Sequence, residues 1–131
     1  MATFQQYKPG IGSVGSYQIA GVPYITGSNA LTVGSEHQIT FPSVARAITV
    51  VMNSASTEMR VHFNASGSGN IVNGRHYVVL DSKEDAISFN VRCKEIYVSS
   101  ATGTCTYTVI AELTGIAASE MGPLTGSGLT E

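Results

Sequence analysis

The chain of 131 residues has the length of one domain, and only 12% of its residues are charged, against about 25% in ordinary soluble domains. Seven basic and nine acidic side chains lie singly along the sequence and give a net charge of −2, without the basic stripe that a phosphate backbone requires. This composition excludes nucleic acid as the expected partner and favours association with other proteins.

The sequence predicts neither export nor a membrane anchor. Its start lacks the charged end and apolar run of a signal peptide, and no apolar stretch is long enough to span a bilayer. The two cysteines, Cys93 and Cys105, lie in alternating strand patterns, where a thiol serves as a small apolar side chain. Two free thiols are therefore favoured over a disulfide, and we expect synthesis in the cytoplasm, with no membrane as partner.

In chain order, a Gly-rich N-terminal arm (residues 1–14) comes before a series of strand patterns with period two. A first strand over 16–26 is interrupted by Gly21 and Pro23, which places it at a sheet edge or makes it an extension of the arm. Seven further strands are predicted over residues 37–41, 46–53, 58–64, 75–81, 86–93, 95–99 and 105–113. We expect an all-β, antiparallel β-sandwich of about eight strands, jelly-roll-like or related, over residues 15–113.

Alternation separates a core face from an outer face in several of these strands. Over 58–64 the odd-numbered residues are apolar, whereas Arg60 and His62 belong to the outer face. The strand over 86–93 alternates in the same way. By contrast, residues 48–52 are apolar on both faces, which predicts a central strand or one that another subunit covers.

The C-terminal arm (residues 114–131) is Gly-rich and has four large apolar residues, whose burial stabilises it by roughly 6–12 kcal/mol. Ordering the backbone costs about 1–2 kcal/mol per residue, so each arm is expected to be either disordered or ordered against a partner. Because pure linkers rarely carry large apolar residues, we favour exchange of both arms between subunits. The anchors expected for this exchange are Phe4, Tyr7, Ile11, Met121, Leu124 and Leu129.

Candidate chemical groups are few. His37, His62 and His76 could hold zinc together with a carboxylate such as Glu36, but no two of them have the spacing of paired ligands on one strand or helix. The serines lie in soft Gly/Ser segments, and the carboxylates at 81–85 share a charged, solvated turn. We therefore predict no catalytic, cofactor-binding or metal site, and a protein that is not an enzyme.

Five segments carry a resemblance to a known class of protein: residues 13–28, 36–42, 60–64, 89–97 and 124–129. They read SVGSYQIAGVPYITGS, EHQITFP, RVHFN, FNVRCKEIY and LTGSGL. With them, most of the chain resembles small structural proteins of the virions of marine tailed bacteriophages, including those that infect cyanobacteria. The resemblance carries a role rather than a site.

The role implied by the resemblance is a capsid-associated β-sandwich that decorates or cements the virion shell. Its partners are then the major capsid protein and copies of itself, and each arm adds a strand or a row of apolar anchors to a neighbour's edge. Two alternatives stay open. One is a structural protein of the tail or the head–tail junction. The other is a carbohydrate-binding β-sandwich module of a tail fibre, for which six tyrosines without a tryptophan give weaker support.

Overall fold

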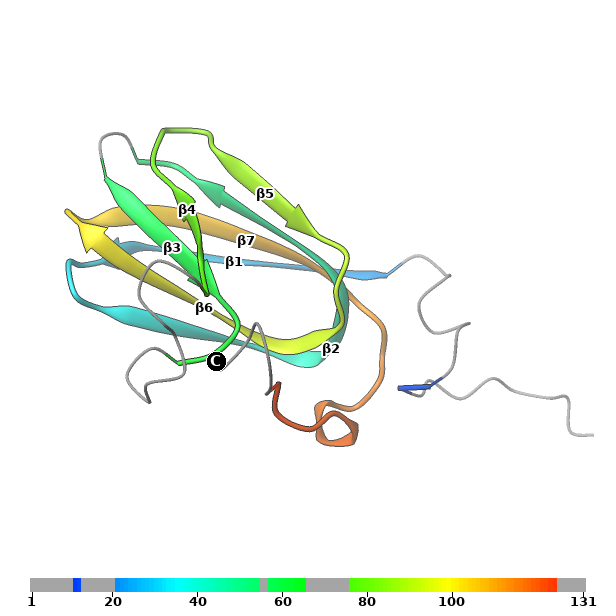
Figure 1. Cartoon of the computed structure of the whole chain (residues 1–131). Helices are drawn as coiled ribbons and strands as arrows, with labels where there is room; N and C mark the ends of the chain where they lie inside the picture. The colour runs from blue at the N-terminus through cyan, green and yellow to red at the C-terminus, as the bar shows by residue number, and fades with distance from the viewer. Residues whose placement is uncertain (1–10, 13–20, 55–56, 66–75, 125–131) are drawn as a thin grey trace, which may run out of the picture.

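Seven strands and one short 3-10 helix make up most of the residues that the computed structural model describes, which are 11–12, 21–54, 57–65 and 76–124 (Figure 1). Every strand pairing is antiparallel, which confirms the expected all-β fold. The elements are β1 (Val22–Leu31), β2 (Glu36–Met52), β3 (Glu58–His62), β4 (Val78–Leu80), β5 (Ala86–Phe89), β6 (Cys93–Thr102), β7 (Cys105–Leu113) and η2 (Ala118–Glu120).

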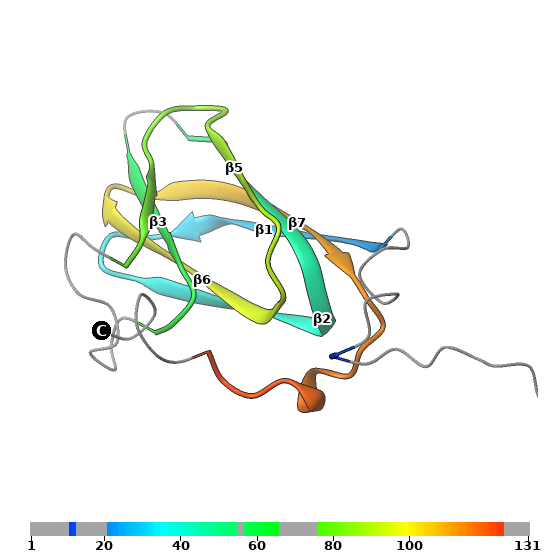
Figure 2. The same cartoon turned by 45° about the vertical axis from the view of Figure 1, so that its right-hand side comes forward.

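The long strand β2 belongs to both layers of the sandwich. Its first part pairs with β6, whereas its last part pairs with β7 on one side and β5 on the other. Beyond these neighbours, β6 continues to β3 and β4, and β7 continues to β1. The layers β4–β3–β6–β2 and β5–β2–β7–β1 face each other across the core in Figures 1 and 2.

The crossing of β2 from one layer to the other lies at a register break between Thr40 and Ala45. Pro42 lies in this break, where a residue without an N–H group removes no ladder hydrogen bond. The neighbouring Phe41 is 1% exposed, and its ring meets the ring of Tyr24 edge-on, with centroids 5.7 Å apart. The two strands predicted over 37–41 and 46–53 therefore form one strand that bends at a proline.

The segment after β7 packs onto the same corner of the sandwich, and Figure 2 shows it (orange to red) running beneath β2 and β6. The N–H of Val44 donates to the carbonyl of Ile116, and the N–H of Thr114 donates to the carbonyl of Val44, both at 2.9 Å. Ile116 is fully buried and Met121 is 7% exposed. The ammonium group of Lys94 donates to the Met121 carbonyl at 2.9 Å. Residues 114–124 are thus ordered against the chain's own core.

The predicted first strand is confirmed as an edge, because β1 stands at one end of the strand order. It begins at Val22 and runs to Leu31, while residues 13–20 lie outside the described part of the chain. At the other end, β7 has the bounds predicted for it. The predicted strands over 86–93 and 95–99 become β5 and β6, separated by three residues without strand pairing. The strand predicted over 75–81 corresponds to β4, which is only three residues long.

Candidate interaction surface

The edge strand β1 carries no charged residue along its ten positions, VPYITGSNAL. It pairs with β7 on one side, and no described strand pairs with its other side. Exposed edges offer unpaired N–H and C=O groups to other chains, and proteins commonly protect them with lysine, other charges or proline. Over Val22–Ser28 only Pro23 provides such protection. This edge is therefore open to the addition of another strand.

Two cross-strand rows of the outer face beside this edge are also uncharged. Ile25 of β1 is 67% exposed and lies opposite Ile110 of β7, which is 38% exposed. Ile110 lies in turn opposite Thr49 of β2, and Thr49 lies opposite Ser88 of β5. The next row along the strands is equally neutral. We call these two rows the neutral face; its residues are Ile25, Ile110, Thr49, Ser88, Gly27, Thr108, Val51 and Ala86.

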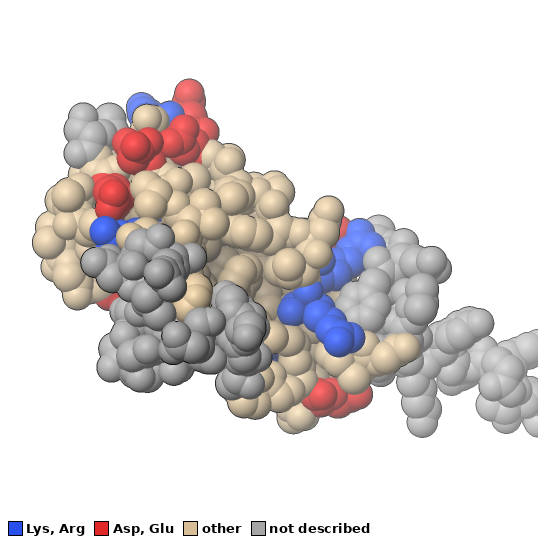
Figure 3. Space-filling view, in the orientation of Figure 1, with Lys and Arg blue, Asp and Glu red and all other residues tan. Residues whose placement is uncertain are grey.

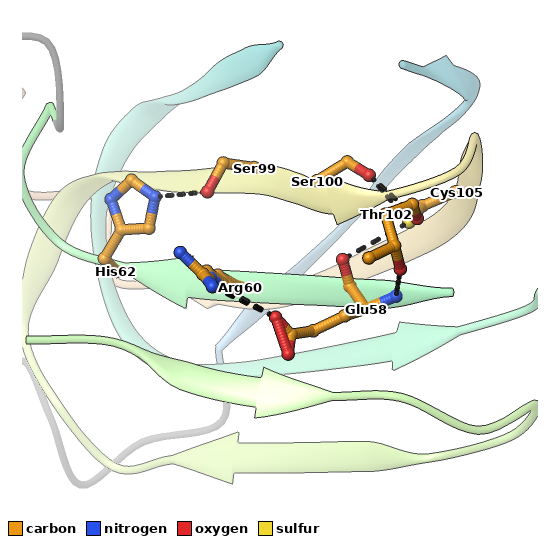
Figure 4. A network of polar contacts seen from close by, with 7 residues as sticks. All are labelled: Glu58, Arg60, His62, Ser99, Ser100, Thr102 and Cys105. Carbon is orange, nitrogen blue, oxygen red and sulfur yellow. Dashed lines mark hydrogen bonds and ion pairs between the residues drawn. The ribbon is translucent and has the colours of Figure 1, made fainter. Parts of the chain in front are cut away.

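A polar network on the opposite layer surrounds His62, which is 2% exposed although the alternation placed it on the outer face (Figure 4). Its Nδ1 lies 2.6 Å from the carbonyl oxygen of Asn64, so we assign the proton to Nδ1. Nε2 then accepts a hydrogen bond from the Ser99 hydroxyl at 3.0 Å. Burial lowers the pKa of His62, and this effect exceeds the opposite effects of the Asn64 carbonyl and the Glu36 carboxylate.

The pairing of Ser99 with His62 resembles the hydrogen bond between a nucleophile and its base, but the rest of the arrangement differs from a catalytic triad. The Glu36 carboxylate lies 3.6 Å from Nε2, the nitrogen that Ser99 already contacts, rather than beside Nδ1. The ring of His62 also stacks on that of Tyr97, with planes 4° apart. A ring this enclosed does not reach a substrate in this conformation. Its contacts instead hold β3 against β6.

The remaining members of the network in Figure 4 join β3 to the β6–β7 turn. Arg60 donates to the Glu58 carboxylate at 3.2 Å, and the Glu58 N–H donates to the Thr102 hydroxyl at 2.9 Å. The Ser100 hydroxyl donates to the Gly103 carbonyl at 2.6 Å. No buried side-chain nitrogen or oxygen among the described residues lacks a partner. The network is therefore satisfied within the chain, as in a structural cluster.

The three histidines do not converge. Nδ1 of His37 lies 2.9 Å from the hydroxyl of Tyr107, whereas His62 lies against β6 and His76 precedes β4. Within the described ranges, no group of three or more His, Cys, Asp or Glu side chains is placed to hold a metal ion.

The two cysteines are buried free thiols, as predicted. Burial raises the pKa of Cys93 to about 12, which keeps this thiol protonated at neutral pH. In structural terms, both cysteines are small apolar core residues.

Three of the six predicted anchors lie in the described part of the chain, whereas Phe4, Tyr7 and Leu129 lie outside it. Met121 is buried in the chain's own core, and Ile11 and Leu124 pack against that core while partly exposed. Contacts of these residues with a second chain stay a prediction. Two exposed apolar residues, Ile25 and Ile110, were not among the predicted contact residues. For Ile25 the sequence did carry a signal, which is the absence of charge over residues 22–31.

Searches of protein-family models, curated proteins and solved structures found no match to this chain. In the part of the chain that the structure describes, no helix has the length and apolar character needed to cross a membrane. The chemistry of the surface is therefore the basis on which a function is assigned.

Proposed function

We propose that the protein is a non-enzymatic structural subunit of a bacteriophage virion, a capsid decoration or cement protein that binds the shell and copies of itself. The observation that carries the binding role is the uncharged β1 edge with the exposed pair Ile25 and Ile110. The virion assignment is supported by the sequence resemblance to structural proteins of marine tailed phages. The protein is made in the host cytoplasm and leaves it in the particle.

The proposed contact is addition of a strand. A strand of a neighbouring protein pairs with the open side of β1 and extends the β5–β2–β7–β1 layer, so that main-chain hydrogen bonds supply the affinity. Apolar side chains of that neighbour cover Ile25 and Val22, which are 67% and 61% exposed. Burial of such residues is worth about 25 cal/mol per Å², and repetition over a symmetric shell multiplies weak contacts into a stable assembly.

The carbohydrate-binding alternative has no comparable observation in its favour. Sugar-binding surfaces need aromatic faces that are open to the ligand. Here the guanidinium of Arg60 lies 4.5 Å from the ring centroid of Tyr77, and Tyr97 stacks on His62. One face of each of these two tyrosine rings is thus engaged within the chain.

The association is tested by the solution mass of the purified chain, measured by light scattering over a range of concentrations. We expect a defined oligomer that Ile25→Lys converts to a folded monomer, because the added ammonium group resists burial at an interface. Val79→Lys is the matched control, since Val79 is a 41% exposed apolar residue on β4. An oligomer unchanged by Ile25→Lys would remove β1 as the contact.

The virion role needs its own test. Antibodies raised against the purified chain are applied to intact particles of a phage that encodes it, and their position is read by electron microscopy. Regular label over the head supports decoration, whereas label on the tail or the neck supports the alternative structural role. Particles that lack the chain altogether would overturn the proposal.

A further inference from the structure

A groove crosses the surface where the connection between β5 and β6 runs beside β2 and β7. Its two hollows measure about 570 Å³ and 330 Å³. Val91 and Arg92 line both hollows, so the two adjoin along these residues. We call them together the Arg92 groove; the described residues that line it are Arg46, Ala47, Asn90, Val91, Arg92 and Glu112 in the larger hollow, and Phe63, Val91, Arg92 and Leu124 in the smaller.

The described lining of the larger hollow is positively charged. It includes two guanidinium groups and one carboxylate, in a chain whose net charge is −2. Arg46 is held by Glu112, whose Oε1 accepts hydrogen bonds from Nε at 3.0 Å and from Nη2 at 2.5 Å. Figure 3 shows the largest group of Lys and Arg atoms on this view at the right of the molecule, with smaller groups at the top and the left. A positive hollow on an acidic chain favours an anionic group of a ligand.

Arg92 retains most of its capacity to bind such a group. A guanidinium has five N–H donors. Within the described residues Arg92 makes one hydrogen bond, from Nη1 to the carbonyl of Ile11 at 3.0 Å, and its side chain is exposed. Its position between the hollows lets it bind a carboxylate by two parallel hydrogen bonds.

The smaller hollow is suited to an apolar side chain. Apart from Arg92, its described lining is the carbon surface of Phe63, Val91 and Leu124. The ring of Phe63 is fixed edge-on by Phe89, with centroids 5.4 Å apart, so one wall is already in place. Its volume of about 330 Å³ lies at the lower end of ligand pockets, which is enough for one or two large side chains.

We propose that the Arg92 groove binds an extended segment of another protein in which a carboxylate side chain stands next to a large apolar side chain. The carboxylate lies between Arg92 and Arg46, and the apolar side chain fills the smaller hollow. A nucleic-acid backbone fits the groove poorly, because Glu112 borders it and the described lining residues hold no basic side chain beyond Arg46 and Arg92. This surface adjoins the β1 edge, since Glu112 pairs with Pro23 of β1, but its lining shares no residue with the neutral face.

The first test is an NMR titration of the full chain with 3-phenylpropionate, a probe that joins a carboxylate to an aromatic ring. We expect shifts of the amide signals of Val91, Arg92 and Leu124. Two matched probes separate the contributions: 3-phenylpropan-1-ol lacks the charge, and propionate lacks the ring. Each is expected to bind at least about tenfold more weakly.

A tetrapeptide then tests the class of partner. Acetyl-Ala-Phe-Glu-Ala-amide is expected to bind more tightly than 3-phenylpropionate, because its backbone can pair with the unpaired strand connection at residues 90–92. The same peptide with Gln in place of Glu is expected to lose about tenfold in affinity. Weaker binding of the peptide than of 3-phenylpropionate would overturn a protein segment as the occupant.

Variants tie the binding to the groove. Arg92→Gln is expected to weaken binding of 3-phenylpropionate about tenfold, whereas Arg60→Gln, a matched charge removal on β3, leaves it unchanged. Unchanged NMR spectra outside the groove verify that both variants fold. The proposal is overturned by equal affinity in Arg92→Gln, by inorganic phosphate binding as tightly as 3-phenylpropionate, or by no shifts at about 10 mM probe. Ile25→Lys changes a residue outside the groove lining and is read by solution mass, whereas Arg92→Gln is read by probe affinity, so the failure of one proposal can be told from the failure of the other.

Discussion

The backbone of Gly27 lies so close to Tyr107 that a Cβ atom at position 27 would stand 2.3 Å from the Tyr107 carbonyl oxygen. Real Cβ atoms do not approach other atoms this closely, and a backbone carbonyl inside a sheet cannot move aside as the end of a flexible side chain can. Close contact of β1 with β7 therefore requires glycine here. The same contact positions the exposed Ile25, two residues earlier.

Gly27→Ala is expected to push β1 away from β7 and to lower the free energy of unfolding by about 1–3 kcal/mol, as overpacking of well-packed sites does. The measurement is the urea midpoint, together with hydrogen exchange of the β1 amides, which should become faster. Gly122→Ala is the control, because a Cβ there meets nothing within 4 Å. Equal midpoints for the two variants would show that β1 is not held by this contact.

The buried His62 makes the stability of the fold depend on pH. Its pKa in the folded chain is lowered below the ordinary value of 6.5, mainly by burial. Between the two pKa values the unfolded chain binds more protons than the folded chain, so stability rises with pH. The contribution of His62 is complete above pH 6.5 and is lost as the pH falls from 6.5 through the folded pKa.

We therefore expect a lower urea midpoint at about pH 5 than at about pH 7.5. His62→Gln should flatten this dependence while costing about 1–3 kcal/mol at neutral pH, because it disturbs buried hydrogen bonds. His76→Gln is the control that should keep the dependence. If the slope persisted in His62→Gln and vanished in His76→Gln, the assignment to His62 would be wrong.

The core position of the cysteines predicts slow thiol chemistry. Because burial raises the pKa of Cys93 to about 12, almost none of this thiol is ionised near pH 8. Cys105 is also fully buried. We expect both thiols to react with Ellman's reagent at least about a hundredfold more slowly in the native chain than in guanidinium chloride. Fast reaction of the native chain would contradict their burial, and no reaction of the unreduced, denatured chain would reveal a disulfide.

Local pattern was sufficient to predict several elements. The bounds of β7 follow from strict alternation of buried and partly exposed residues between Cys105 and Leu113. Gly21 and Pro23 indicated a sheet edge or an extended arm, and β1 is an edge strand, because proline removes a ladder donor. The acidic turn was also predicted correctly, since Ser82, Lys83 and Glu84 are exposed in the structure.

Features that depend on distant partners were not predictable in this way. Separate strands were predicted over 37–41 and 46–53, yet β2 continues through Pro42 because the proline falls where the strand changes layers. His62 was assigned to the outer face, and its burial depends on Ser99, 37 residues away. The Arg92 groove likewise joins Arg46 and Arg92 from different elements, which single-sequence periodicity does not bring together.

The extent of the C-terminal arm gives the last prediction. Four apolar side chains alone do not offset the entropy of ordering the segment, but Thr114 and Ile116 also make hydrogen bonds with Val44 of β2. Those bonds, and a core surface that β2 to β7 already form, order the segment at least as far as Leu124. A chain shortened after residue 113 therefore loses part of its core and not only an arm.

We expect a chain that ends at residue 113 to be strongly destabilised or unfolded. It lacks Ile116, fully buried, and Met121, 7% exposed. Removing such side chains costs about 2–5 kcal/mol each, against a total stability of about 5–15 kcal/mol for a domain. A chain that ends at residue 124 keeps both and should unfold in urea close to the full-length midpoint, which makes it the proper variant for testing arm exchange. If the chain ending at 113 matched it, the packing of Ile116 would contribute nothing to stability.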